Sequence, residues 1–270
     1  MVGSMPPPKP SAEPTPPAAE PLVRLAGIGK AFGLEPAAIE RIDLQLAPGE
    51  FACLVGPSGC GKSTLLRMLA GLAEPTSGRI DWAESPAPGR IGCVFQEPTL
   101  MPWARVWDNV ALPLRLHGEG RRAVAERVDE ALGLVGLADR ALAFPRELSG
   151  GMKMRVSIAR ALVTRPRVLL MDEPFAALDE ITRFRLNDDL LRLWREQALT
   201  VLFVTHSVYE SVYLAQRVLV MASNPGRITA EIAVDEPYPR DESFRREASY
   251  GQTCGRVSEA LKLASDQGCL

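Results

Sequence analysis

The feature that most constrains this chain is a glycine-rich loop between two apolar segments. Residues 56–64 read GPSGCGKST, with a glycine, four free positions and then Gly-Lys-Ser, which is the pattern of loops that bind phosphate groups. The apolar residues 51–55 before the loop predict a buried strand, and residues 65–70 after it predict a helix. Such a loop binds a nucleotide when it joins a strand to a helix in this order. A glycine turn that merely opens a helix is the alternative, and both flanking elements argue against it.

Each part of this loop has an expected role in holding a nucleoside triphosphate. The glycines let backbone N–H groups face the phosphates, and the helix N-terminus adds a partial positive charge. Lys62 is expected to reach the β- and γ-phosphates, and Ser63 to be a ligand of Mg²⁺. Cys60 is expected to be a small filler rather than a redox switch, because only Lys62 beside it would lower its pKa. The expected nucleotide-binding residues of the loop are Gly56, Pro57, Ser58, Gly59, Cys60, Gly61, Lys62, Ser63 and Thr64.

A second signal of nucleotide chemistry lies at the end of another apolar segment. Residues 168–171 predict a buried strand, and Asp172 and Glu173 follow it directly. Asp172 at the strand tip is expected to hold Mg²⁺, directly or through water. Glu173 is expected to polarise the water that attacks the γ-phosphate. A plain exit from a strand into a turn is the alternative for these residues taken alone, and the phosphate loop makes that alternative the weaker one.

The order of the predicted elements indicates an α/β fold around a mostly parallel sheet. The apolar runs at 168–171, 200–205 and 217–221 are separated by segments with helical periodicity. This is typical of parallel strands whose two faces are covered by helices. Residues 22–25 and 42–46 instead alternate with period two, which predicts the half-exposed strands of an antiparallel β subdomain.

The character of the sequence changes at several points and suggests how the chain is divided. Residues 1–21 are rich in proline and predict a disordered, extended tail, and residues 22–236 are expected to form the folded domain. Within it, residues of about 97–160 predict a helical subdomain inserted into the α/β core. Residues 237–270 are expected to form a polar tail with one short helix around residues 257–263.

The bulk properties of the chain exclude some classes of function. The formal net charge is −2, which argues against a general affinity for nucleic acid. The five cysteines are widely spaced and form no pairs typical of metal sites, so a reduced, cytosolic setting is the simplest interpretation. No stretch approaches the roughly 18 consecutive apolar residues that span a bilayer. We therefore expect the chain to be soluble and to meet a membrane only through a partner.

Residues 148–152, LSGGM, make the resemblance to a known family specific. They resemble the signature motif of ATP-binding cassette (ABC) ATPases, which usually ends in glutamine. The other motifs of that family stand in the same order, and the resemblance covers roughly residues 22–230. It implies a P-loop NTPase (RecA-like) core and a head-to-tail dimer that holds two ATP molecules at its interface. The ordered motifs are Phe32, residues 56–64, Gln96, residues 148–152, Asp172 with Glu173, residues 177–179, and His206.

The resemblance implies roles for residues that serve the nucleotide of their own chain. Phe32 resembles the aromatic residue that stacks on adenine, although a lone phenylalanine before a turn is also compatible with a core position. Gln96 resembles the glutamine that senses Mg²⁺ and the attacking water, and His206 resembles the switch histidine that contacts the γ-phosphate. The expected catalytic residues are Glu173, His206, Gln96 and Lys62, and the expected Mg²⁺ ligands are Ser63, Gln96 and Asp172.

Other residues are implied to act across the dimer. Ser149, Gly150 and Gly151 would contact the ATP held by the phosphate loop of the partner, and a Ser-Gly-Gly turn that opens a helix is suited to bind an anion. A simple helix N-cap is the alternative for Ser149, and the two roles are compatible. Asp179 resembles the aspartate that communicates across the interface. Met152 departs from the usual glutamine, which leaves the Ser-Gly-Gly contact intact.

Three longer stretches resemble one branch of the family. Residues 96–103, 152–155 and 171–183 are similar to the ATPases of nitrate, sulfonate and taurine importers and of related importers of pyrimidine precursors. In that branch the segment after Gln96 receives a cytoplasmic helix of the membrane subunit, and an exposed apolar patch suits such a helix. The alternative is that the tryptophans of this segment, Trp103 and Trp107, simply pack the helical subdomain.

The resemblance therefore implies an ATP-hydrolysing importer subunit at the cytoplasmic face of a bacterial inner membrane. Its implied partners are a second copy of the chain, transmembrane permease subunits and, indirectly, an extracytoplasmic solute-binding protein. A soluble, non-transport ABC ATPase is one alternative, but it would predict two cassettes or a basic insertion, and neither is present. A nucleotide sensor without hydrolysis is another, and the presence of Lys62, Asp172, Glu173 and His206 argues against it. The cargo cannot be identified from this chain, because a motor subunit does not contact it.

Overall fold

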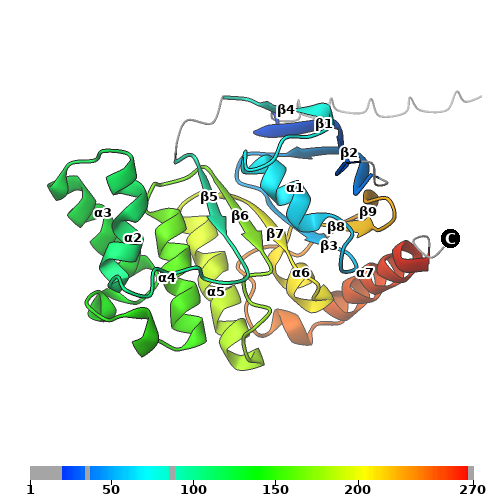
Figure 1. The fold of residues 1–270 in the computed structure, drawn as a ribbon. Coiled ribbons are helices and arrows are strands. Elements are labelled where there is room, and N and C mark those ends of the chain that lie inside the picture. The colour runs from blue at the N-terminus through cyan, green and yellow to red at the C-terminus, as the bar shows by residue number, and fades with distance from the viewer. Residues whose placement is uncertain (1–19, 34–36, 85–88, 267–270) are drawn as a thin grey trace, which may run out of the picture.

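The apolar runs of the sequence form a six-stranded sheet in the computed structural model, which describes residues 20–33, 37–84 and 89–266 (Figure 1). The strand order is β5-β6-β7-β3-β8-β9, and each neighbouring pair is parallel except β8 and β9. The α/β fold with a mostly parallel sheet is therefore confirmed. The strands are β5 (Ile91–Val94), β6 (Val168–Asp172), β7 (Thr200–Val204), β3 (Phe51–Val55), β8 (Arg217–Ala222) and β9 (Arg227–Ala233).

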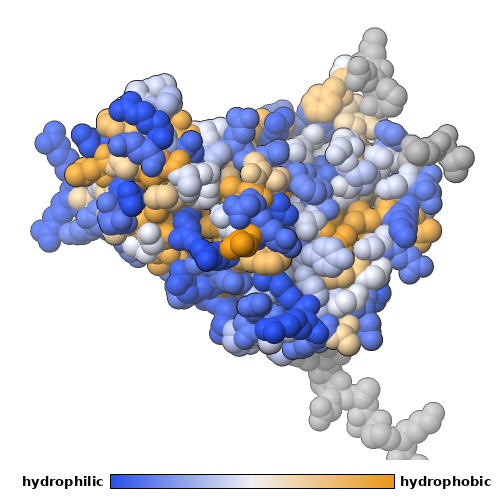
Figure 2. Space-filling model, turned by 90° about the horizontal axis from the view of Figure 1, so that it is seen from below, coloured by the Kyte–Doolittle hydropathy of each residue, from blue (hydrophilic) through white to orange (hydrophobic). Residues whose placement is uncertain are grey.

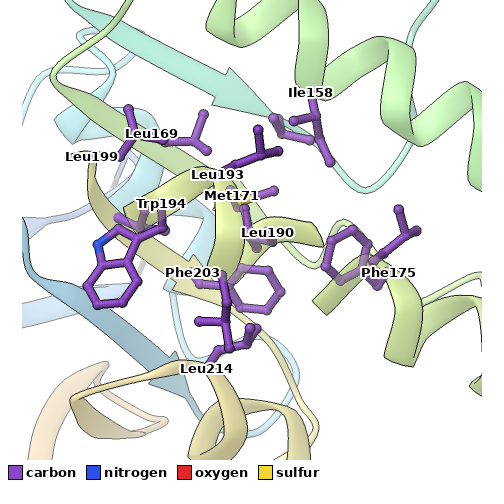
Figure 3. Packing of buried hydrophobic residues seen from close by; sticks show 14 of the residues in the cluster. Ile158, Leu169, Met171, Phe175, Leu190, Leu193, Trp194, Leu199, Phe203 and Leu214 are labelled. Carbon is purple, nitrogen blue, oxygen red and sulfur yellow. The ribbon is translucent and has the colours of Figure 1, made fainter. Parts of the chain in front are cut away.

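Both faces of this sheet are buried, which explains why its central strands are apolar without alternation. Every residue of β3 and β7 is buried. Phe51 and Phe203 point into a core shared with α4 (Gly150–Leu162), α5 (Glu180–Glu196) and α6 (Val208–Leu214). The ring of Phe51 packs on those of Trp194 and Phe203, and Figure 3 shows Phe203 beside Phe175 in this core. The alternate residues Ala52, Leu54, Leu202 and Val204 point into a second core with α1 (Lys62–Leu69). Burial of each large apolar side chain contributes about 1.5–3 kcal/mol.

The antiparallel piece predicted near the N-terminus is present and covers the second core. Its strand order is β2-β1-β4, and the strands are longer than the alternation alone indicated. Residues 23, 25, 28, 42, 44 and 46 alternate inward and join the core beneath α1. The three strands are β1 (Val23–Lys30), β2 (Ile39–Leu46) and β4 (Ser77–Trp82).

The inserted segment forms helices that pack on one another at one end of the molecule (left in Figure 1). In α3 the buried residues Val124, Val128, Ala131 and Leu132 recur at helical spacing and lie on one face. The helix α4 continues from this end into the core and follows the signature-like motif. The segment contains α2 (Val106–Leu116), α3 (Arg121–Leu134) and two short 3-10 turns, Ala138–Arg140 and Pro145–Glu147.

The C-terminal segment differs from the prediction of a polar tail. Instead of a short helix around residues 257–263, it contains a 3-10 turn, Phe244–Arg246, and a helix of 19 residues, α7 (Ala248–Asp266). The prediction failed because polar residues and two glycines, Gly251 and Gly255, interrupt the apolar residues in the first half of α7, although Tyr250, Cys254 and Val257 are buried in the first core. Strand β9 was not predicted either, because most of its residues are at least partly exposed.

Arg240 ties this segment to α6. Its guanidinium donates to the carbonyls of Val212, Tyr213 and Ala215 at the end of α6, and to those of Val234 and Glu236. A cation at the C-terminus of a helix is favourable because it offsets the partial negative charge there. The C-terminal segment is thus part of the folded unit.

The expected N-terminal tail, residues 1–21, lies outside the described residues except for its last two. Within the described ranges no helix has the length and apolar character needed to cross a membrane.

Candidate nucleotide-binding site

The glycine-rich loop joins β3 to α1 as predicted, and its backbone depends on glycine at two points. Gly61 has φ of 99°, and a Cβ there would lie 2.8 Å from Cγ1 of Ile39 at the start of β2. At Gly56 a Cβ would lie 2.5 Å from the backbone oxygen of Met221. Among the described residues, no side chain caps the N-terminus of α1. Its first N–H groups are therefore available to an anion.

Lys62 lies over this loop and is only 5% exposed. Its Nζ donates to the backbone oxygens of Gly56 at 2.8 Å and Pro57 at 2.9 Å. Cys60 Sγ lies 3.8 Å from the same nitrogen, yet burial raises the pKa of the thiol and outweighs the effect of Lys62. The arrangement agrees with Cys60 as a small filler and holds the lysine charge where phosphates would bind. The remaining loop residues, Ser58, Gly59 and Thr64, are exposed or half-buried.

The two oxygen-bearing residues predicted to hold Mg²⁺ meet directly. Ser63 in the first turn of α1 donates from Oγ to Oδ1 of Asp172, the last residue of β6, at 3.0 Å. Burial raises the pKa of Asp172, the Ser63 hydrogen bond opposes this, and the carboxylate of Glu173 adds to it. A hydroxyl and a carboxylate are ligands that Mg²⁺ prefers, and a cation beside Asp172 would favour its ionised form. These residues therefore fit a magnesium ion.

Glu173 and His206 also meet, although 33 residues separate them in the chain. Oε2 of Glu173 lies 3.0 Å from Nδ1 of His206, and both side chains reach solvent. Glu173 has φ of 46°, a left-handed conformation that is unfavourable for a residue other than glycine. Its N–H donates to the oxygen of Val204 at the end of β7. Backbone strain of this kind is concentrated at functional sites.

The strand order brings Gln96 to the same edge of the sheet as Glu173 and His206. Gln96 follows β5, which pairs in parallel with β6, and it is exposed two residues beyond the end of the strand. Gln96, Asp172, Glu173 and His206 therefore all follow the carboxyl ends of neighbouring strands. Ligands of open α/β sheets bind at this edge.

Phe32 is not a core residue. It lies on the loop between β1 and β2, is 52% exposed, and has Lys30 Nζ at 5.2 Å from its ring centroid. The start of β2 at Ile39 contacts Gly61 of the phosphate loop. An exposed aromatic ring on this loop is available for stacking on a planar base.

The residues expected to act across a dimer form a separate group. Ser149 caps α4 by accepting from the N–H of Met152 at 3.3 Å, and Asp179 caps α5 by accepting from Thr182 N–H at 2.9 Å. A Cβ on Gly151 would lie 2.7 Å from Cγ2 of Thr182, so the two caps are adjacent, while Ser149 and Gly150 are exposed. Over the part of the chain that the structure describes, no hydrogen bond or ion pair joins this group to Lys62, Ser63 or Asp172.

Two residues that the sequence did not single out fix the segment after Gln96. Asn109 is fully buried in α2, and its side chain bonds to the backbone of Met101, Ala104 and Arg105. Arg160 in α4 donates to the oxygens of residues 98 and 99. No pattern in the sequence indicated these contacts, because they join side chains to backbone oxygens of another segment.

The segment held by Asn109 exposes one of the two tryptophans. Trp103 is 77% exposed. Trp107 instead packs against the first core, and its Nε1 lies 3.3 Å from Asp129 of α3. Packing of the subdomain therefore accounts for Trp107 and not for Trp103.

Comparison with known proteins gives a consistent result. The family described as "ABC transporter" matches residues 39–176. The aliphatic sulfonates import ATP-binding protein SsuB of Rhodopseudomonas palustris (strain BisA53) is 48% identical over 216 residues, covering 80% of this chain and 75% of that protein. The protein SsuB 1 of Pseudomonas fluorescens, of the same description, is 52% identical over 207 residues, with 77% and 75% covered.

A solved structure is similar over the same region. It is the dimeric, post-hydrolysis state of an ATP-binding cassette bound to ADP and Pi, and it is 31% identical with a TM-score of 0.69. The match covers 80% of this chain and 100% of that one.

Proposed function

This chain belongs to the ABC transporter family, and on that premise we propose that it is the ATP-hydrolysing subunit of an importer for a small solute. An aliphatic sulfonate is the first candidate cargo because similar proteins are described as sulfonate importers, and taurine, nitrate or a pyrimidine precursor are the others. The observation that carries the proposal is the meeting of Ser63 with Asp172 and of Glu173 with His206 at one edge of the sheet.

The phosphate loop accounts for binding of ATP. The phosphates would accept from the free N–H groups at the start of α1, and the Lys62 ammonium would exchange its two carbonyl partners for phosphate oxygens. Phe32 would stack on the adenine. Ser63, Asp172 and Gln96 would hold Mg²⁺, which supplies charge neutralisation on the phosphates.

Hydrolysis needs a polarised water and a stabilised γ-phosphate. Glu173 would accept a proton from the attacking water, and the contact with His206 keeps the carboxylate at the strand tip. His206 would contact the γ-phosphate, and Gln96 would orient the water. These three side chains are accessible from the same edge of the sheet.

The other half of each site would come from a second copy of the chain. Ser149, Gly150 and Gly151 open α4 with exposed backbone, which suits the γ-phosphate of the partner's ATP. Asp179 caps the adjacent helix and would transmit the contact across the interface. A solved cassette of similar fold is dimeric, which supports this arrangement. A single chain should therefore bind ATP and hydrolyse it slowly.

The segment around Trp103 is the proposed docking surface for a membrane subunit. Trp103 and Leu142 are 77% and 71% exposed, and Arg105 joins their segments by a hydrogen bond to the oxygen of Leu142. Figure 2 shows hydrophobic residues exposed among hydrophilic ones at this end of the molecule, over the helices α2 and α3. An apolar patch with a polar rim suits the apolar face of a partner helix. The chain would bind the cytoplasmic face of the bacterial inner membrane through this partner, and a solute-binding protein would deliver the cargo from outside.

The proposal is tested with the chain and its membrane subunits in liposomes. Glu173→Gln should bind ATP normally but lower ATP hydrolysis and uptake about 100-fold or more. It should also accumulate as an ATP-bound dimer in size-exclusion chromatography. Lys62→Ala should lose nucleotide binding and serves as the control. Unchanged hydrolysis by Glu173→Gln, or no ATP-dependent uptake of any of the four solute classes, would refute the proposal.

A further inference from the structure

A buried carboxyl follows the exposed His206 by four residues. Glu210 in the first turn of α6 is 7% exposed, and its Oε2 accepts from the Thr205 hydroxyl at 2.5 Å. Its other oxygen, Oε1, is buried and has no hydrogen-bond partner among the residues that the structure describes. A buried carboxylate with an unpaired oxygen is unfavourable, and burial indeed raises the pKa of Glu210. A group held at such an energetic cost needs a physical explanation.

The hydrogen bond from Thr205 reaches the turn that carries His206. Thr205 is buried at the end of β7, and its Oγ1 also accepts from the N–H of Ser207 at 3.0 Å. Ser207 in turn accepts from the N–H of Glu210 through Oγ. His206 is therefore flanked on both sides by residues that Glu210 holds, while its own Nδ1 lies beside Glu173.

The second unpaired group lies across from Glu210 on α5. Asn187 is buried there and its Oδ1 has no partner among the described residues, while a hydrogen bond from its side chain lowers the pKa of Glu210 and so favours the ionised carboxylate. The positive charge of Arg183, one turn earlier, also lowers the pKa of Glu210. Its Nη2 donates to the oxygen of Leu178, and its buried Nε has no partner among the described residues. Of the six buried side-chain N or O atoms without a partner among the described residues, three belong to this cluster.

The cluster connects two loops that differ in role. Leu178 precedes Asp179, the cap of α5, whereas Thr205 and Ser207 surround His206. We infer that Glu210 is a positioning residue: it holds the His206 turn through Thr205 and couples that turn, through Arg183 and Asn187, to the start of α5 at Asp179. When a second chain shifts the start of α5, the unpaired atoms of Glu210, Asn187 and Arg183 would gain hydrogen-bond partners. The position of His206 would then depend on whether the second chain is bound. The inference rests on the proposed function, which gives His206 and Asp179 their roles.

The test combines ATP hydrolysis by the complex with nuclear magnetic resonance of the untagged chain. The chain has only two histidines, so the imidazole signals of His206 are identified by comparison with His117→Gln. Glu210→Gln keeps the size and the acceptor for Thr205 but removes the charge, and Thr205→Val removes the hydroxyl while Thr205→Ser keeps it. The matched control is Glu50→Gln, because Glu50 is a largely buried, ion-paired carboxylate at the opposite edge of the sheet.

We expect Glu210→Gln and Thr205→Val to lower kcat about 10- to 100-fold, the loss typical of residues that orient a functional side chain. KM for ATP should change little, and the His206 signals should shift. Thr205→Ser and Glu50→Gln should retain kcat and the His206 signals. Arg183→Met should lower kcat as well, and its combination with Glu210→Gln should lose less than the product of the two single effects, because both act on one network.

Unchanged kcat and unchanged His206 signals in a folded Glu210→Gln protein would overturn the inference. Equal losses in Thr205→Ser and Thr205→Val would also overturn it, since the hydroxyl would then be irrelevant. If the unaltered complex does not hydrolyse ATP, the proposed function fails. The resonance measurement needs no nucleotide and still decides whether Glu210 positions His206.

Discussion

The hydrogen bonds of the Asn109 side chain to residues 101, 104 and 105, which we call the Asn109 clamp, allow a prediction of stability. The magnitude of the expected loss follows from the number of these bonds. Its Oδ1 accepts from the N–H of Met101 at 2.7 Å, and its Nδ2 lies 3.0–3.2 Å from the oxygens of Met101, Ala104 and Arg105. An amide has only two N–H donors, so we count three effective hydrogen bonds. At about 1 kcal/mol each, Asn109→Ala should lower the free energy of unfolding by about 3 kcal/mol.

This loss should be visible in both stability and coupling. For a chain of this size about 3 kcal/mol lowers Tm by about 6–12 °C, measurable by differential scanning fluorimetry. The freed segment carries Trp103, so stimulation of ATP hydrolysis by the membrane subunits should fall at temperatures where the protein is still folded. Basal hydrolysis by the isolated chain should be retained.

Trp103→Ala is the matched control because the side chain is 77% exposed and makes no part of the clamp. It should keep Tm and lose the stimulation. A Tm within about 1 °C of the unaltered chain for Asn109→Ala would refute the hydrogen-bond argument. Normal stimulation of Trp103→Ala would refute the assignment of the docking surface.

Two further predictions follow from buried ionisable groups. Burial raises the pKa of Glu210, so its contribution to stability should fall as pH rises above the ordinary pKa of 4.5, while Glu210→Gln should show no such loss. The difference in Tm, variant minus unaltered, should therefore grow with pH, and a difference that stays constant with pH would contradict this. Burial also raises the pKa of Cys93 and Cys254 to about 11, and that of Cys60 above its ordinary value. Iodoacetamide at neutral pH should modify these thiols slowly in the folded chain and quickly in guanidinium chloride, which mass spectrometry can follow. Rapid modification of Cys60 in the folded chain would disprove its role as a filler.

The parts of the fold that the sequence predicted are those with a strong local signal. Strands β3, β6 and β7 are continuous apolar runs because both of their faces are buried, so no partner had to be known. The helix α7 and strand β9 lacked such a signal. In α7 the buried positions are held by tyrosine, cysteine and valine among polar residues, and only contact with α6 and β8 makes them a core face.

The candidate site also contains residues that the sequence could predict and residues that it could not. The side chains that we propose to act on a ligand stand in ordered motifs, and Ser63, Asp172, Glu173 and His206 could be named from the sequence. For the residues that hold these motifs in place, the sequence could not predict which groups they contact. Asn109 and Arg160 bind backbone oxygens of a distant loop, and any sequence offers such oxygens. The role of Glu210 depends on α5 and α6 being adjacent, which no local pattern shows.

The left-handed backbone of Glu173 has a consequence for laboratory evolution. A conformation of this kind costs roughly 1–3 kcal/mol in a residue with a side chain, and glycine or asparagine at this position would relieve much of it. A selection that rewards thermostability alone would therefore favour replacement of the residue that we propose as the catalytic base. Libraries built on this chain should keep position 173 fixed, or select for ATP turnover and heat resistance together, so that robustness is gained elsewhere in the fold.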